Sequence, residues 1–158
     1  MDLVQFIRDR LNNDEQVARA AMWDEQSDTW TARPPQARYE QYIVADYCDD
    51  GVVVVTPENA DADGVGQHIA RHDPARVLAE VDAKRRTLDL HGIVHRNIGW
   101  RDADGEAEYA ELPVCGHCVP KHTHYLTREG VAEGPCTTVR LLGLPHADHL
   151  DYRDDWRP

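Results

Sequence analysis

The chain has 158 residues, a net charge of −12 and a hydrophobic share of 41%, which suits one compact domain with a real core. No apolar run approaches the roughly 18 residues of a membrane-spanning helix, and the first residues lack the basic and apolar segments of a secretory signal. These features predict a cytoplasmic protein. The acidic charge disfavours nucleic-acid binding, because phosphate contacts need clustered cations, and one such cluster stands at Lys84–Arg86.

The first expected element is a helix from residue 2 to about residue 24. Leu3, Ile7 and Leu11 recur at the helical period, and the same apolar stripe is expected to continue through Val17 and Ala21. The stripe is expected to be widened by Val4, Ala18 and Met22. Asp2 is suited to cap the start of this helix.

A β-hairpin is expected next, over residues 38–47 and 51–56, because both stretches are rich in strand-forming residues. Their connection contains an Asp-Gly step, which is a strong signal for a tight turn. Trp30 is a candidate for another strand of the same sheet. Cys48 lies in the connection, far along the chain from the other cysteines, and is interpreted as a free thiol.

Two helices are expected after the sheet, a short one over residues 65–71 and a longer one from Pro74 to about His91. Asp73 before Pro74 is typical of a helix start, which explains Asp73 without a catalytic role. One face of the longer helix carries Val77, Val81, Leu88 and His91.

Less regular structure is expected in the last third of the chain. Residues 92–112 are predicted to be extended or looped, with a turn at 102–105 and a strand over 106–112 that leads into a cysteine pair. A short helix is expected over residues 139–144, ended by Pro145.

The sharpest feature is Cys115-Gly-His-Cys118, followed 18 residues later by Cys136. A C-x-x-C on a tight turn directs two thiolates at one tetrahedral metal, and Gly116 is expected to ease that turn by accepting a positive φ. Cys136 follows a Gly-Pro step at the start of a predicted helix, whose dipole favours a thiolate. In a chain without a secretory signal, this pattern indicates metal ligands rather than disulfides.

A tetrahedral site needs a fourth ligand, and His91 is the residue that we select. The alternative for His91 is a helix-terminal side chain that interacts with the last carbonyls. His117, His122, His124 and His146 are competitors. We therefore predict a structural zinc ion held by Cys115, Cys118, Cys136 and His91, because thiolate with imidazole suits zinc.

The same residues allow two enzymatic interpretations. Cys-Gly-His-Cys also occurs in disulfide isomerases, where it opens a helix, but here Val114 precedes it and Pro120 disfavours a continuing helix. A zinc hydrolase requires an open metal position beside a carboxylate. The His146-Ala-Asp-His149 motif is interpreted as surface, because it lacks the His-Glu-x-x-His pattern.

Several stretches together resemble an uncharacterised domain-of-unknown-function family of GC-rich, actinobacteria-type genomes and their phages. They are residues 2–8, the run from His68 to Arg86, Cys-x-x-Cys at 115–118, and Pro135-Cys136 continuing to Trp156. The resemblance covers nearly the full chain and implies that the cysteine pair and Cys136 form one constellation, without implying an activity. Family members tend to read Pro-Tyr-Ala-Asp-His-Pro where this chain has Pro145-His-Ala-Asp-His-Leu150, which gives no support to a role for His146.

The expected fold is α+β, with an N-terminal helix, a small antiparallel sheet, a central helix and a C-terminal zinc-stabilised lobe. Residues 1–158 are predicted to form a single domain, with a body at 1–91 and a zinc-knuckle lobe at 92–158. The expected function is that of a non-enzymatic accessory protein, of phage origin, that binds a protein partner. The alternatives are a nucleic-acid-binding regulator, an acidic DNA-mimic inhibitor, a zinc hydrolase and a C-x-x-C redox protein.

Overall fold

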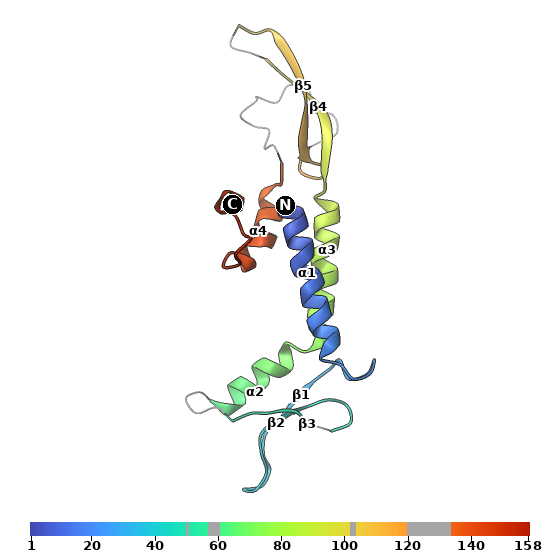
Figure 1. Ribbon diagram of the computed structural model, residues 1–158, viewed down its shortest axis with the longest axis vertical. Coiled ribbons are helices and arrows are strands. Elements are labelled where there is room, and N and C mark those ends of the chain that lie inside the picture. Colours follow the sequence, from blue (N-terminus) through green and yellow to red (C-terminus); the bar gives the residue numbers. More distant parts are fainter. Residues whose placement is uncertain (50, 57–60, 102–103, 120–133) are drawn as a thin grey trace. The chain divides into compact units, whose positions relative to one another are not determined.

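The computed structural model describes residues 1–49, 51–56, 61–101, 104–119 and 134–158. Within these residues the fold is α+β, as the sequence predicts, with four α-helices and two small antiparallel sheets (Figure 1). The chain divides into two compact units, which are described separately. The terminal unit combines residues 1–11 with 83–158, and the central unit is residues 12–82. The predicted single domain with a body and a lobe stays a prediction.

Helix α1, Leu3–Ala20, begins where the sequence predicts, because the Asp2 carboxylate accepts the N–H of Gln5 at 2.8 Å. In the terminal unit its buried face carries Leu3, Phe6, Ile7 and Leu11. The predicted continuation through Val17 and Ala21 is wrong, since both are exposed, whereas Ala18, expected to widen the stripe, is buried. Ala18 lies two turns beyond Leu11 on the same side of the helix, whereas Val17 is turned away by about 100°.

A three-stranded antiparallel sheet lies in the central unit, in the order β1 (Thr31–Arg33), β2 (Ile43–Ala45), β3 (Gly51–Val54). The predicted hairpin is present as β2 and β3, but both strands are shorter than expected. Residues 38–41 remain outside the sheet and exposed, because pairing with the three-residue β1 begins only at Ile43. Trp30 directly precedes β1, and Asp50 of the predicted turn lies outside the described residues.

Helix α2, Ala62–Arg71, packs against this sheet through a close approach at Gly66. A Cβ at Gly66 would lie 2.2 Å from Cε1 of Tyr42, so no larger residue fits there without moving the ring. One hydrophobic cluster of the central unit consists of Tyr42, Val44, Val55 and Ala70.

Helix α3, Pro74–Leu90, starts as predicted, because Asp73 accepts the N–H of Arg76 at 2.9 Å. The other carboxylate oxygen of Asp73 accepts the N–H of Trp30 at 3.3 Å, which explains why this acidic residue is buried. In the terminal unit the end of α3 lies beside the start of α1, where Arg8 and Asp89 approach to 3.6 Å.

A two-stranded ribbon follows directly, formed by β4 (Ile93–Arg101) and β5 (Ala107–Cys115). The strands pair without interruption from Ile93 opposite Cys115 to Arg101 opposite Ala107, although the sequence predicts only extended or looped structure for most of this segment. Residues 102 and 103 of the predicted turn lie outside the described residues. One face of the ribbon is apolar and is buried with Val119; it carries Ile98, Trp100, Ala110, Leu112 and Val114.

The end of the chain packs on the N-terminal helix of the same unit. The chain continues from α4 (Thr137–Gly143) through two short 3₁₀ turns, Leu144–His146 and Asp154–Trp156. Four rings from this last segment surround Phe6, with ring centroids 5.3–6.3 Å from the centroid of Phe6. They belong to His146, His149, Tyr152 and Trp156. The two histidines are therefore half-buried and pack on Phe6, so the motif is less exposed than a surface interpretation implies. Among the described helices, none combines the length and the apolar character needed to cross a bilayer.

Candidate metal centre

The register of the ribbon brings His91 to the cysteine pair. His91 is the first residue beyond α3, and its N–H still bonds the carbonyl of Thr87 at 3.0 Å, so its position is fixed by the helix. Two residues later Ile93 pairs with Cys115, the last residue of β5. The end of the helix and the end of the returning strand therefore meet, although His91 and Cys115 are 24 positions apart.

The segment Cys115–Val119, here called the knuckle turn, reverses the direction of the chain and is held by backbone hydrogen bonds. The Gly116 N–H donates to the carbonyl of Gly92 at 2.9 Å, and the Val119 N–H donates to that of Cys115 at 3.1 Å. Gly116 is not among the described glycines with positive φ, so the predicted reason for it is wrong. A Cβ at Gly116 would instead lie 3.3 Å from the Gly92 oxygen, so the residue permits a close approach of two backbones.

Arg96 of β4 holds the knuckle turn from the ribbon side. Its guanidinium donates to the carbonyl of Gly116 at 2.9 Å and also to the carbonyl of Val119. These charge-assisted bonds fix both ends of the segment that carries Cys118. Arg96 escaped the sequence analysis, because only the strand register shows that its side chain reaches the turn.

The third cysteine arrives on a separate segment. The Gly134 N–H donates to the carbonyl of Pro113 at 2.8 Å, which anchors the chain beside β5 just before Cys136. Cys136 is the N-cap residue of α4 and is 8% exposed. Arg140 of the same helix donates to the Pro135 carbonyl at 3.1 Å, and this contact holds the turn that presents the sulfur.

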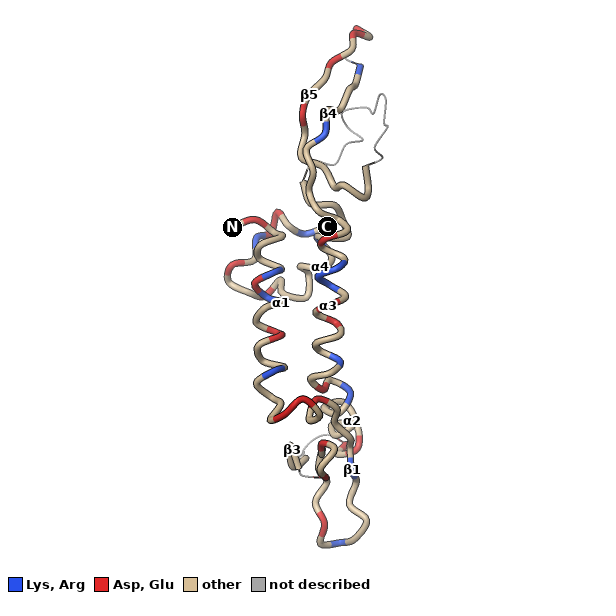
Figure 2. Tube along the Cα trace, turned by 90° about the vertical axis from the view of Figure 1, so that its right-hand side faces the viewer, with Lys and Arg blue, Asp and Glu red and all other residues tan. Residues whose placement is uncertain are grey.

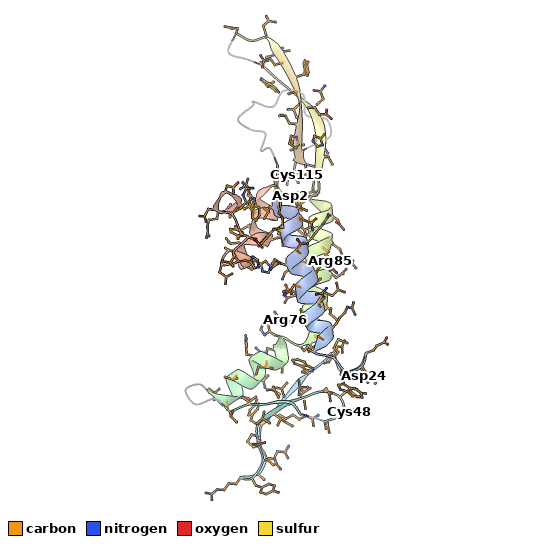
Figure 3. All side chains as sticks on the ribbon, viewed as in Figure 1. Asp2, Asp24, Cys48, Arg76, Arg85 and Cys115 are labelled. Carbon is orange, nitrogen blue, oxygen red and sulfur yellow. The ribbon has the colours of Figure 1, made fainter. Side chains whose placement is uncertain are left out.

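The structure brings the four predicted ligands together at the base of the ribbon, where Figure 3 labels Cys115. Nδ1 of His91 lies 3.4 Å from Sγ of Cys115, 3.5 Å from that of Cys118 and 3.4 Å from that of Cys136. All four ligand atoms lie within 4.8 Å of one another. A tetrahedral zinc ion with ordinary Zn–N and Zn–S bonds places nitrogen about 3.6 Å from each sulfur, which matches this arrangement.

The surroundings shift the pKa values of Cys118 and Cys136 in opposite directions. The hydrogen bond with Cys115, together with burial and the nearby Cys136, raises the pKa of the Cys118 thiol to about 12. Burial by itself raises the pKa of Cys136, but the N–H groups of Val139 and Thr138 and the neighbouring thiols outweigh it, so that its pKa is lowered. Bringing all three sulfurs to the thiolate state therefore calls for a cation among them.

None of the other candidates among the described residues belongs to this ligand set. The ring of His117 approaches that of His91 edge-on, with centroids 4.9 Å apart, but His117 is exposed and outside the ligand set. His146 packs on Phe6, and Cys48 is an exposed free thiol in the central unit. His122 and His124 lie outside the described residues.

DUF6221, a family of unknown function, matches the chain over residues 1–158. The chain belongs to this family. No curated protein and no solved structure matches it. No activity is assigned to DUF6221, so the geometry of the site is the basis for any proposed function. The predicted association with actinobacteria-type genomes and phages stays a prediction.

Proposed function

We propose that this protein is a non-enzymatic accessory protein whose terminal unit is closed by a structural zinc ion and which acts by binding another macromolecule. The observation that supports zinc is the convergence of three sulfurs on one imidazole nitrogen at 3.4–3.5 Å. Three thiolates and one imidazole form a soft donor set that suits zinc better than magnesium, calcium or manganese.

A structural role is favoured because four protein ligands complete a tetrahedron and leave no position for water or substrate. Within the described residues the cluster contains no carboxylate, which counts against the zinc hydrolase. The zinc joins the end of α3, the ribbon and the start of α4. A small unit gains from such a link stability that its core alone would not supply.

The redox alternative needs a helix that starts at the first cysteine. Cys115 instead ends β5, and the described residues after it form a turn. A thiol pair that shares a buried imidazole with a third thiol is arranged for metal binding rather than for exchange with a substrate disulfide.

The macromolecular partner is proposed because the site offers no catalytic position. The DNA-mimic alternative requires a continuous acidic stripe, but acidic and basic residues are interspersed along α1 and α3 (Figure 2). The regulator alternative rests on Lys84–Arg86 of α3, where Arg86 is exposed and Lys84 and Arg85 are half-buried. It requires binding of DNA or RNA that weakens steeply with salt.

Elemental analysis of the purified chain by mass spectrometry tests the zinc proposal. Wild type is expected to carry about one zinc per chain, a value set by one tetrahedral site, and His91→Ala and Cys118→Ser are expected to lose most of it. His117→Ala and Cys48→Ser are matched controls, because each removes the same ligand type outside the cluster. Wild-type protein free of metal, or equal zinc loss in the controls, would overturn the proposal.

A further inference from the structure

An exposed aromatic pair on the central unit has no role in the zinc site. The rings of Trp23 and Tyr47 stack with centroids 5.7 Å apart and an interplanar angle of 16°. Trp23 is 64% exposed and Tyr47 is 47% exposed, so a large part of both rings faces solvent. Single exposed aromatics need no explanation, but a stacked pair of the two residue types most enriched in binding hot spots does.

Both rings are fixed by their polar atoms. Nε1 of Trp23 donates to the Asp46 carboxylate at 2.6 Å, and the hydroxyl of Tyr47 donates to the Asp24 carboxylate at 2.6 Å. Asp46 is 4% exposed and also accepts the N–H of Cys48 at 3.0 Å, so its position is itself fixed. The polar groups are satisfied within the protein, while the apolar ring faces remain available.

The loop that carries Trp23 is also rigid. The buried hydroxyl of Ser27 accepts the N–H groups of Trp23 and Asp24 and donates to the Asp24 carbonyl. The Asp24 carboxylate accepts two further backbone N–H groups, from Gln26 and Ser27. A surface held in this way loses little conformational entropy on binding, which is the usual advantage of a preorganised site.

The charge around the rings selects the partner. The pair is carried by residues 23–28 and 46–49, which contain no Lys or Arg. These segments contain five carboxylates, which belong to Asp24, Glu25, Asp28, Asp46 and Asp49. Asp49 is paired with Arg33 and Asp46 is buried, so the negative charge of the surface comes from Asp24, Glu25 and Asp28. Asp24 and Cys48 lie on the same side of the unit (Figure 3). An acidic rim repels the phosphates of nucleic acid. It also repels a second copy of this chain, since a twofold interface would place the same carboxylates against each other.

We infer that the Trp23–Tyr47 surface, with its rim of carboxylates, binds an arginine-bearing segment of a basic protein. A guanidinium is flat and weakly hydrated, so it stacks on the indole face while its N–H groups reach the carboxylates. This inference names the class of partner and rests on the partner-binding half of the proposed function. It does not depend on the zinc ligands, which belong to the terminal unit.

Fluorescence anisotropy with the zinc-loaded full chain and a labelled hexa-arginine peptide, at about 150 mM salt, tests the inference. The peptide is expected to bind, and hexalysine is expected to bind several-fold more weakly, because both carry the same charge but only arginine stacks well. Trp23→Ala and Tyr47→Ala are each expected to weaken hexa-arginine binding about fivefold or more. Circular dichroism establishes that these variants are folded.

Two matched controls separate the surface from general acidity. Tyr39→Ala removes another exposed tyrosine of the same unit, and Glu111→Gln removes one negative charge from the ribbon. Neither is expected to change the affinity, whereas Asp24→Asn is expected to reduce it.

The inference would be overturned if hexa-arginine did not bind. It would also be overturned if hexa-arginine and hexalysine bound with equal affinity and Trp23→Ala left that affinity unchanged. Binding of a single-stranded DNA oligonucleotide that is lost in Trp23→Ala would overturn it in favour of nucleic acid. A partner captured from host lysate equally by wild type and Trp23→Ala would support the proposed function and reject this surface.

Discussion

Replacing Phe6 tests how the two ends of the chain stabilise the terminal unit. Phe6 is fully buried, and its ring contacts four other rings and the guanidinium of Arg10. Phe6→Ala removes a fully buried aromatic side chain, for which about 3–5 kcal/mol of unfolding free energy is expected to be lost. Phe6→Leu keeps most of the apolar volume and loses the ring pairs. Each pair contributes about 0.5–1.5 kcal/mol non-additively, so about 1–3 kcal/mol is expected.

Urea denaturation of the zinc-loaded protein, followed by tryptophan fluorescence and circular dichroism, measures these losses. Trp156 is a suitable reporter because its ring centroid lies 5.3 Å from that of Phe6. Val17→Ala is the matched control: Val17 is on the same helix and looks like a core residue in the sequence, but it is 62% exposed. Its effect is expected to stay within about 0.5 kcal/mol. A loss below about 1 kcal/mol for Phe6→Ala, or an equal loss for Val17→Ala, would refute the reasoning.

Three further changes test other parts of the molecule. Gly66→Ala is expected to lower the melting temperature, because the new Cβ would lie 2.2 Å from the Tyr42 ring and overpacking destabilises by about 1–3 kcal/mol; unchanged melting would contradict this packing. Arg96→Met is expected to speed loss of the proposed zinc ion to a chelator, since two carbonyls of the knuckle turn lose their donor, and equal release rates would argue against that role. The hydrogen bond to Asp24 raises the pKa of Tyr47 above its usual value of 10.0. This hydrogen bond therefore stabilises the fold fully below about pH 10, and the stabilisation is lost as the pH rises through the raised pKa. Asp24→Asn should shift one tyrosine ionisation to lower pH in an ultraviolet titration, and an unshifted curve would contradict the coupling.

The helices were predictable because their signals are local. Asp2 and Asp73 act as the caps that their positions indicate, and α3 spans almost the expected residues. The strands were less predictable. Residues 38–41 look like a strand but pair with no strand of the described part of the chain, whereas β4 and β5 are stabilised by pairing along their whole length. Strand formation depends on a neighbour that sequence period alone does not identify.

The four clustered residues were selected from spacing, chemistry and the need for a fourth tetrahedral ligand. Their supporting contacts could not be predicted in this way. The register of the ribbon lets Arg96 donate to the knuckle turn, and the direction of α4 lets Arg140 donate to the carbonyl of Pro135. Trp23 and Tyr47 were also missed as a pair, because they are 24 positions apart and meet through the carboxylates that hold them.

The contact between Arg10 and His149 spans 139 positions of the chain, and this separation has a consequence during translation. The central unit is one continuous stretch of sequence, but the terminal unit needs both the first and the last residues. At ~5–20 residues per second, roughly 7–30 s pass between the synthesis of Phe6 and the synthesis of the rings that cover it. During that interval the apolar face around Phe6 lacks its cover, and a chain that stops before residue 146 would leave this face exposed.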